Sequence, residues 1–132
     1  MIEIRDLCVR AGDFKLDNIN LRVPDSGYAV LMGKTGCGKT TLLECVCGLK
    51  RAQGGSIRFG SYDVTDLRPA ERGVGFVPQD GAIFSTMKVA DQLAFGPRMR
   101  GWEKSAALTR ALEMGEELGI GHLMDRSPRG LS

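Results

Sequence analysis

The first part of the chain alternates apolar and polar residues, the pattern of half-buried β-strands. Residues 2–9 alternate in this way with one slip at Asp6, and residues 14–16 and 19–23 repeat the pattern. Residues 28–32 are instead a continuous apolar run, which is typical of a buried strand. We therefore expect an antiparallel β unit, followed by a buried strand over residues 28–32.

Between residues 48 and 80 the pattern predicts short strands and turns. Residues 56–59 and 62–64 have the pattern of a small hairpin. Pro69 predicts a short helical turn. Residues 73–77 form another apolar run, which predicts a second buried strand.

From residue 87 onward the pattern becomes helical. Residues 89–95 predict a short helix that stops at Gly96-Pro97, and residues 102–118 predict a longer helix. The chain thus divides at about Asp80 into parts 1–80 and 81–132. The apolar face expected on the longer helix consists of Leu108, Ala111, Leu112, Gly115 and Leu118.

A glycine-rich loop lies between the predicted strand 28–32 and a predicted helix over residues 41–49, which Gly48 stops. The loop, residues 33–40, matches G-x-x-x-x-G-K-[ST] at every fixed position. A glycine-rich turn could match by accident, but the strand and the helix stand where phosphate binding requires them. The predicted phosphate-binding residues are Gly33, Lys34, Thr35, Gly36, Cys37, Gly38, Lys39, Thr40 and Thr41.

The residue types in this loop suit a polyphosphate with a magnesium ion. The glycines allow backbone conformations that other residues disfavour, so that successive N–H groups point inward at the positive end of the helix. Lys39 would neutralise the β- and γ-phosphates. The Thr40 hydroxyl would ligate Mg²⁺, which phosphates and water otherwise hold.

Composition narrows the function classes. The chain has 132 residues, of which 42% are hydrophobic and 26% charged, as in a soluble globular domain or part of one. A net charge of +2 gives no reason to expect nucleic acid as a partner. No apolar stretch is long enough to span a bilayer and the N-terminus does not read as a signal peptide, so we expect a cytosolic protein.

The four cysteines form no metal-binding pattern, because there is no C-x-x-C pair and no histidine nearby in the sequence. We expect Cys8, Cys45 and Cys47 to be small buried hydrophobic residues. Cys37 lies within the loop, and we expect alkylation of its thiol to block nucleotide entry.

A second motif accompanies the loop. The stretch Gly75-Phe76-Val77-Pro78-Gln79-Asp80 ends the predicted strand and precedes the helical part. Together with the loop, it resembles the ATP-binding subunit of ABC transporters, and Leu131-Ser132 stands where the family's LSGGQ signature begins. The resemblance implies an α/β fold: a P-loop NTPase core with an N-terminal antiparallel β subdomain and the start of the ABC helical subdomain. It assigns 1–80 to the nucleotide-binding part, with the phosphate and glutamine loops, and 81–132 to a partial helical subdomain.

Within the family, the chain most resembles subunits of molybdate, tungstate or sulfate importers. Gly27-Tyr28, Leu42-Leu43-Glu44, Asp63-Val64-Thr65 and the segment 69–75 carry this similarity. The implied function is binding of ATP and Mg²⁺ in an ATPase that drives solute import.

The resemblance implies roles for two residues outside the phosphate loop. Phe14 matches the aromatic residue that stacks on adenine, although a core strand residue is an equally good reading. Gln79 matches the glutamine that contacts Mg²⁺ and the attacking water. Asp80 does not fit a magnesium-binding aspartate of a Walker B strand, because Pro78-Gln79 interrupts the pattern. His122 precedes the signature, so we expect it to have a structural role at a helix end rather than that of the family's switch histidine.

The resemblance also implies partners and a mechanism. It implies a head-to-tail dimer with a second ATP-binding subunit, docked on membrane permease subunits at the inner face of the cell membrane. The 132 residues contain no Walker B acidic residues, complete signature or switch histidine, so we expect the chain to be inactive as an ATPase on its own. We also expect poor solubility, because the central strand would lack neighbours.

The sequence leaves open two alternatives to an ABC transporter ATPase. One is a non-hydrolysing nucleotide-binding or interaction module that ends at Ser132. The other, less favoured, is a small P-loop kinase, for which the sequence offers no phosphoacceptor site.

Overall fold

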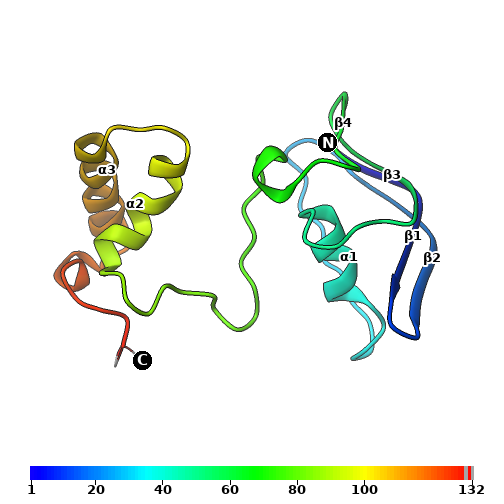
Figure 1. The fold of residues 1–132 in the computed structure, drawn as a ribbon, viewed down its shortest axis with the longest axis horizontal. Helices are drawn as coiled ribbons and strands as arrows, with labels where there is room; N and C mark the ends of the chain where they lie inside the picture. The colour runs from blue at the N-terminus through cyan, green and yellow to red at the C-terminus, as the bar shows by residue number, and fades with distance from the viewer. Residues whose placement is uncertain (130, 132) are drawn as a thin grey trace. The chain divides into compact units, whose positions relative to one another are not determined.

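A computed structural model describes residues 1–129 and 131 of the chain (Figure 1). The chain packs as two compact units, Met1–Phe76 and Val77–Ser132. The assignment of residues 1–80 and 81–132 to functional domains stays a prediction.

An antiparallel sheet forms most of the first unit. In the described residues it has the strand order β2-β1-β3-β4. Strand β1 pairs with both β2 and β3, and Ile4 lies opposite Leu21 on one side and Ile57 on the other. The slip in the alternation at Asp6 is a β-bulge in which Asp6 has a φ of 47°. The strand bounds are Ile2–Ala11 for β1, Phe14–Val23 for β2, Gly54–Phe59 for β3 and Tyr62–Asp63 for β4.

The predicted turns of this unit are confirmed. The β3–β4 hairpin turns at Gly60 and Ser61, where Gly60 has a φ of 59°. A short 3₁₀ helix, η1, spans Pro69–Glu71. Local turn chemistry therefore determines these two features.

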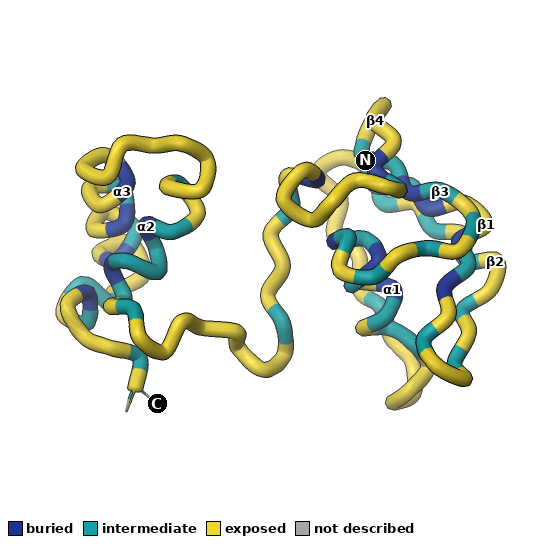
Figure 2. Tube along the Cα trace, in the orientation of Figure 1, coloured by how far each residue is buried: buried dark blue, intermediate teal, exposed yellow. Residues whose placement is uncertain are grey.

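One helix, α1 (Lys39–Val46), covers a face of the sheet (Figure 1). It begins two residues before the predicted start, and its C-terminal flank reaches Gly48 in a left-handed conformation with a φ of 79°. The buried residues between α1 and the sheet appear dark blue in Figure 2. This core consists of Ile4, Leu7, Val9, Leu42, Cys45, Ile57 and Val64.

The buried strand expected over residues 28–32 is wrong for the structure. Tyr28 is 93% exposed and Met32 is 87% exposed. Within the described residues, the backbone of 28–32 forms no hydrogen bond with another segment. A strand requires a neighbour that completes its hydrogen-bond ladder, and apolar sequence alone does not supply one.

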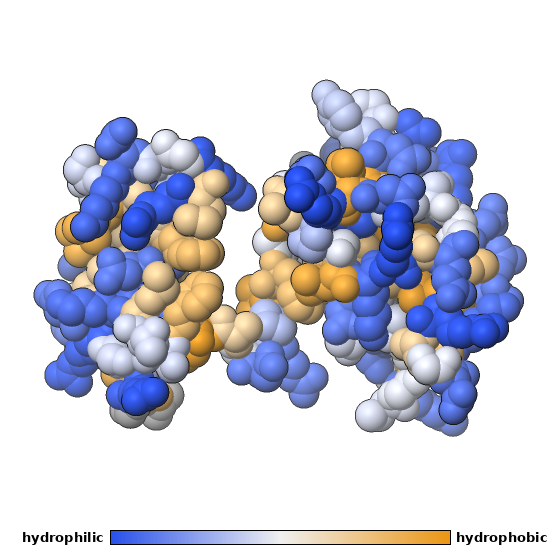
Figure 3. Space-filling model, viewed as in Figure 1, coloured by the Kyte–Doolittle hydropathy of each residue, from blue (hydrophilic) through white to orange (hydrophobic). Residues whose placement is uncertain are grey.

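The second predicted buried strand, residues 73–77, is wrong for the same reason. The segment has no paired neighbour in the described part of the chain, and Phe76 and Val77 are exposed. Figure 3 shows hydrophobic residues at the surface of each unit.

The second unit is a helical hairpin with a short third helix. Helix α2 (Val89–Met99) packs against α3 (Lys104–Glu117), and η2 (Gly121–Leu123) follows. Every helix in the described residues is too short or too polar to cross a lipid bilayer.

Helix α2 does not stop at Gly96-Pro97 as expected, but continues to Met99. Pro97 lies in the last turn, where its missing N–H removes only one helical hydrogen bond. The carbonyl groups of Gly96 and Pro97 still accept hydrogen bonds from Arg100, at 3.3 and 3.0 Å.

The predicted apolar face of α3 is only partly correct. The structure buries Ala107, Ala111 and Gly115, whereas Leu108, Leu112 and Leu118 are exposed. Helix α2 presents Ala90 and Ala94, so the two helices pack through small residues. At Gly115 an added Cβ would lie 2.6 Å from the sulfur of Met124, so a larger residue there would require the Met124 side chain to shift.

Candidate phosphate-binding site

The glycine loop connects the extended segment 28–32 to the first turn of α1. Gly38 is the N-cap residue of the helix, with a φ of 96° and a ψ of 12°, and Gly36 has a φ of 80°. Residues with a Cβ are strained in this left-handed region. The backbone of the loop therefore requires glycine at both positions.

Strand β2 supports the loop from the side of the sheet. A Cβ at Gly38 would lie 2.6 Å from Cζ of Phe14 and 2.8 Å from Cδ2 of Leu16. The missing side chain at position 38 thus allows the start of α1 to approach the sheet. Because both neighbours come from β2, the sheet directly fixes where the helix begins.

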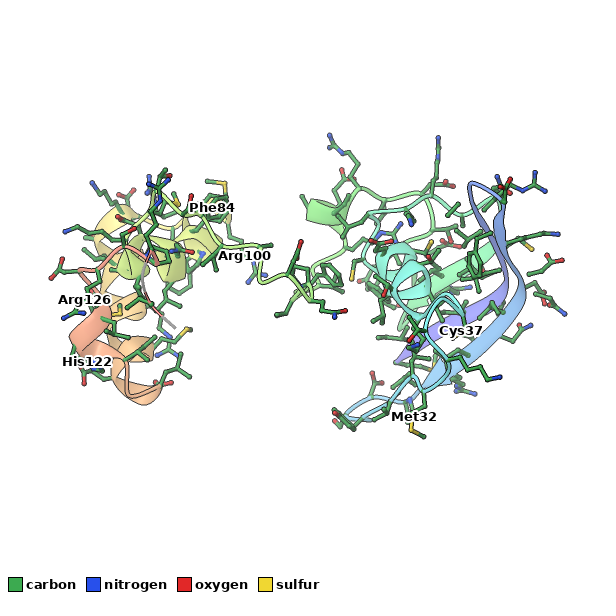
Figure 4. All side chains as sticks on the ribbon, turned by 90° about the horizontal axis from the view of Figure 1, so that it is seen from below. Met32, Cys37, Phe84, Arg100, His122 and Arg126 are labelled. Atoms are coloured by element: carbon green, nitrogen blue, oxygen red, sulfur yellow. The ribbon has the colours of Figure 1, made fainter. Side chains whose placement is uncertain are left out.

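Lys39 ties the two ends of the loop together. Its ammonium group donates hydrogen bonds to the carbonyl oxygens of Gly33 and Lys34, each at 2.9 Å. Inside the loop, the N–H of Cys37 donates to the Lys34 carbonyl at 3.3 Å, and the Cys37 sulfur lies 3.8 Å from the Lys39 nitrogen. Figure 4 labels Cys37 at this end of the helix. The Lys39 ammonium group is therefore held against the carbonyl oxygens of the loop rather than directed away into solvent.

The start of α1 provides hydrogen-bond donors without competing negative charge. The backbone bond from Leu42 to Gly38, at 2.9 Å, closes the first helical turn. The N–H groups before Leu42 have no carbonyl partner inside the helix. The first turn contains no acidic residue, and Thr40 is exposed. Such a helix end favours an anion.

These residues fit a nucleotide with Mg²⁺, provided that the phosphates bring the metal. Across the described residues, no group of three or more His, Cys, Asp or Glu could hold a metal ion. A single hydroxyl such as that of Thr40, together with phosphate oxygens and water, is a ligand set that Mg²⁺ accepts.

The other predicted site residues are placed as follows. Phe14 is half-buried on β2 beside Gly38, so it stands next to the loop and also packs within the unit. Gln79 is exposed in the second unit, and its relation to the loop stays a prediction. His122 is an exposed residue of η2, and its structural role stays a prediction. Ser132, the second signature residue, lies outside the described residues.

The cysteines differ in their surroundings. Cys45 and Cys47 are buried as expected, and burial raises the pKa of both thiols. Cys37 is exposed. The expectation for Cys8 was wrong, since this thiol is half-buried and donates a hydrogen bond to the Asp17 carboxylate at 3.0 Å.

Sequence reasoning missed the role of Arg72, which entered only as part of a motif. Its side chain is 7% exposed and contacts the C-terminal end of α1. An arginine in a polar loop is normally exposed, so the sequence carries no signal of this burial.

The family follows from a comparison with known proteins. A family model described as "ABC transporter" matches residues 16–132. The chain belongs to the ABC transporter family. This confirms the resemblance carried by the phosphate loop and by Gln79 with its neighbours.

Curated relatives of this ABC transporter chain include ATP-binding proteins of importers. It is 42% identical over 123 residues to the molybdate/tungstate import ATP-binding protein WtpC of Archaeoglobus fulgidus, covering 93% of this chain and 50% of the relative. It is 35% identical over 132 residues to the maltose/maltodextrin import ATP-binding protein MalK of Salmonella typhimurium, covering 99% and 36%. The chain thus spans half or less of the length of these relatives.

Solved structures share the fold. The dimeric ATP-binding cassette MJ0796 bound to ADP and Pi has a TM-score of 0.86 and 20% identity, with 100% of this chain and 63% of that chain covered. A nucleotide-free ATP-binding cassette from an ABC transporter has a TM-score of 0.81 and 26% identity, with 100% and 59% covered. The expected fold, a P-loop NTPase core with an N-terminal antiparallel β subdomain and the start of the helical subdomain, is confirmed.

Proposed function

We propose that this chain binds the phosphates of ATP, with Mg²⁺, as part of an ABC transporter ATPase. The observation that supports this most directly is the loop at the start of α1, over which two backbone carbonyls hold the Lys39 ammonium. An anion there would meet a cation, helix N–H groups and no carboxylate from the first turn.

Different residues would contact different parts of the bound nucleotide. The amides of residues 33–38 would surround the β-phosphate, and Lys39 would reach the β- and γ-phosphates. Thr40 would ligate Mg²⁺, and Thr41 would donate its amide to the α-phosphate side of the ligand. Phe14 would stack on adenine, and Gln79 would contact Mg²⁺ and the attacking water.

We further propose that the protein drives import of an oxyanion such as molybdate, tungstate or sulfate. The name of the WtpC relative and the resemblance of segment 69–75 support this class of solute. The MalK relative, whose identity is only slightly lower, is named instead for import of maltose and maltodextrin. The partners would be a second ATP-binding subunit in a head-to-tail dimer and membrane permease subunits, at the cytoplasmic face of the membrane. Membership of the family favours this function over a non-hydrolysing module.

Hydrolysis would require more than phosphate binding. Phosphoryl transfer depends on positioning a water and stabilising charge, and Asp80 does not fit the Walker B aspartate because Pro78-Gln79 interrupts the pattern after segment 73–77. We propose that these 132 residues bind nucleotide without turning it over.

The test is a fluorescence titration with methylanthraniloyl-ATP in the presence and absence of Mg²⁺. The Lys39→Met variant should bind at least about tenfold more weakly, because it loses a charge-assisted contact to phosphate. Lys15→Met is the matched control, since Lys15 is an exposed β2 lysine that pairs with Asp17. Equal affinity of wild type and Lys39→Met would contradict phosphate binding at this loop.

A further inference from the structure

In the part of the chain that the structure describes, Arg72 is the one charged residue whose side chain is buried. Its guanidinium donates four hydrogen bonds, all to backbone carbonyl oxygens. These are Cys45 at 2.8 Å, Val46 at 3.0 Å, Leu67 at 2.9 Å and Thr65 at 2.9 Å. Taking an arginine out of water is costly unless its donors are satisfied, so this arrangement indicates a specific role.

The nearby acidic residues are engaged by other cations. Glu44 pairs with Lys50 at 3.0 Å, and Glu71 pairs with Arg68 at 2.9 Å. Asp66 lies 3.8 Å from Arg51. The charge of Arg72 is therefore matched by the carbonyl groups at the end of α1, the negative end of the helix dipole.

These hydrogen bonds connect two separate segments. Cys45 and Val46 belong to the last turn of α1, whereas Thr65 and Leu67 belong to the loop before η1. A planar guanidinium carries five N–H donors on three nitrogens in a fixed fork, whereas a lysine ammonium carries three donors on a single nitrogen. Arg72 thus acts as a cross-link between the end of α1 and this loop.

The chain leaves space for this cross-link at Gly48. A Cβ there would lie 2.6 Å from Nε and 3.0 Å from Cζ of Arg72. Gly48 also has a φ of 79°, so a larger residue would be strained as well as crowded. The position that ends the helix is therefore also the one that admits the guanidinium.

Helix α1 is short enough for a change at one end to affect the other. Its eight residues span about 12 Å. The Gly38 end rests on Phe14 and Leu16, and the other end is held by Arg72. Between these two supports, Leu42, Cys45 and Val46 pack against the core of the unit.

We propose that Arg72 is a positioning residue for phosphate binding. By holding the C-terminal end of α1, it sets the direction of the amides and of Lys39 at the N-terminal end. Arg72 itself contacts no ligand in this scheme. The inference rests on the proposed function, because it concerns the phosphate loop of the same helix.

The experiment separates positioning from folding by using two ligands. Inorganic tripolyphosphate probes the loop alone, and adenosine probes the base contact alone. Both are measured by displacement of methylanthraniloyl-ATP from the native chain, well below the melting temperature. The variants are Arg72→Lys and Arg72→Met. Arg68→Lys and Arg68→Met are matched controls, since Arg68 is exposed in the same loop and pairs with Glu71.

The proposal predicts that Arg72→Met weakens tripolyphosphate binding by roughly tenfold and that Arg72→Lys weakens it less, with adenosine unchanged. The Arg68 variants should bind both ligands like the wild type. If the folded Arg72 variants bind tripolyphosphate normally, or lose both ligands equally, the proposal is overturned. If neither Arg72 variant folds, the residue serves folding alone and the proposal is likewise overturned. Failure of the wild type to bind any nucleotide would instead refute the proposed function.

Discussion

Cζ of Phe14 lies 2.6 Å from the place where a Cβ of Gly38 would stand. This contact places strand β2 directly against the residue that precedes α1, and so positions the phosphate loop relative to the sheet. It explains why the loop needs glycine here for space as well as for backbone conformation.

The Gly38→Ala variant should therefore be less stable than the Gly36→Ala variant. Both residues have a positive φ, which costs an alanine about 1–3 kcal/mol. Only Gly38 has neighbours within 4 Å of an added Cβ. Urea unfolding followed by circular dichroism would measure the difference, because the single tryptophan, Trp102, reports on the other unit. Equal stability of the two variants would show that the side chains of Phe14 and Leu16 can move to accommodate the added methyl group without lowering the free energy of unfolding.

The same contact leaves two roles for Phe14, and substitution can separate them. Phe14→Leu keeps an apolar side chain against Gly38 but removes the aromatic face. If Phe14 stacks on adenine, this variant should bind ATP roughly fivefold more weakly, since such contacts contribute about 1 kcal/mol. Its affinity for inorganic tripolyphosphate should be unchanged.

Phe14→Tyr is the matched control for the stacking role, because it retains the ring. Displacement of methylanthraniloyl-ATP would measure both variants. Wild-type affinity for ATP in Phe14→Leu would assign the residue to packing alone.

Cys37 provides a chemical test of the loop. Its exposed sulfur lies 3.8 Å from the Lys39 nitrogen, so a maleimide attached there should occupy the space of the phosphates and abolish nucleotide binding. Cys45 and Cys47 should react slowly near neutral pH, because burial raises the pKa of both thiols and keeps them protonated.

The labelling should be done in a Cys8→Ser background, since Cys8 is half-buried and could also react. Mass spectrometry would identify the modified residue, and Cys37→Ser would serve as the unlabelled control. Full nucleotide affinity after stoichiometric labelling of Cys37 would place its side chain outside the site.

Local sequence predicted those parts of the fold that depend on near neighbours. Alternation predicted β1 and β2, including the irregularity at Asp6, and the loop motif predicted the turn into α1. Residues 28–32 and 73–77 were wrong because strand pairing depends on a partner elsewhere in the chain, which hydrophobic runs do not specify.

Contacts between elements were also beyond the sequence pattern. The buried face of α3 depends on Ala90 and Ala94 of α2, which allow close packing through Ala107 and Ala111. The burial of Arg72 depends on the carbonyl groups at the end of α1. Neither relationship can be obtained from the spacing of apolar residues alone.

The exposed apolar segment 28–32 should make the 132-residue polypeptide self-associate. Tyr28 and Met32 are largely exposed, and the backbone groups of this segment are free to pair among the described residues. Such an edge is a template for strands of other copies, and a lysine on it should oppose pairing through charge repulsion. We therefore expect Val30→Lys to shift the wild type from oligomers toward a monomer in size-exclusion chromatography with light scattering.

Lys substitution at an exposed apolar residue of the other unit provides the control. Leu108→Lys adds the same charge and removes a similar apolar side chain on α3, where the backbone groups are paired within the helix. If self-association arises from strand pairing, Leu108→Lys should remain oligomeric. A wild type that is monomeric and melts cooperatively would show instead that residues 28–32 do not act as an open edge in solution.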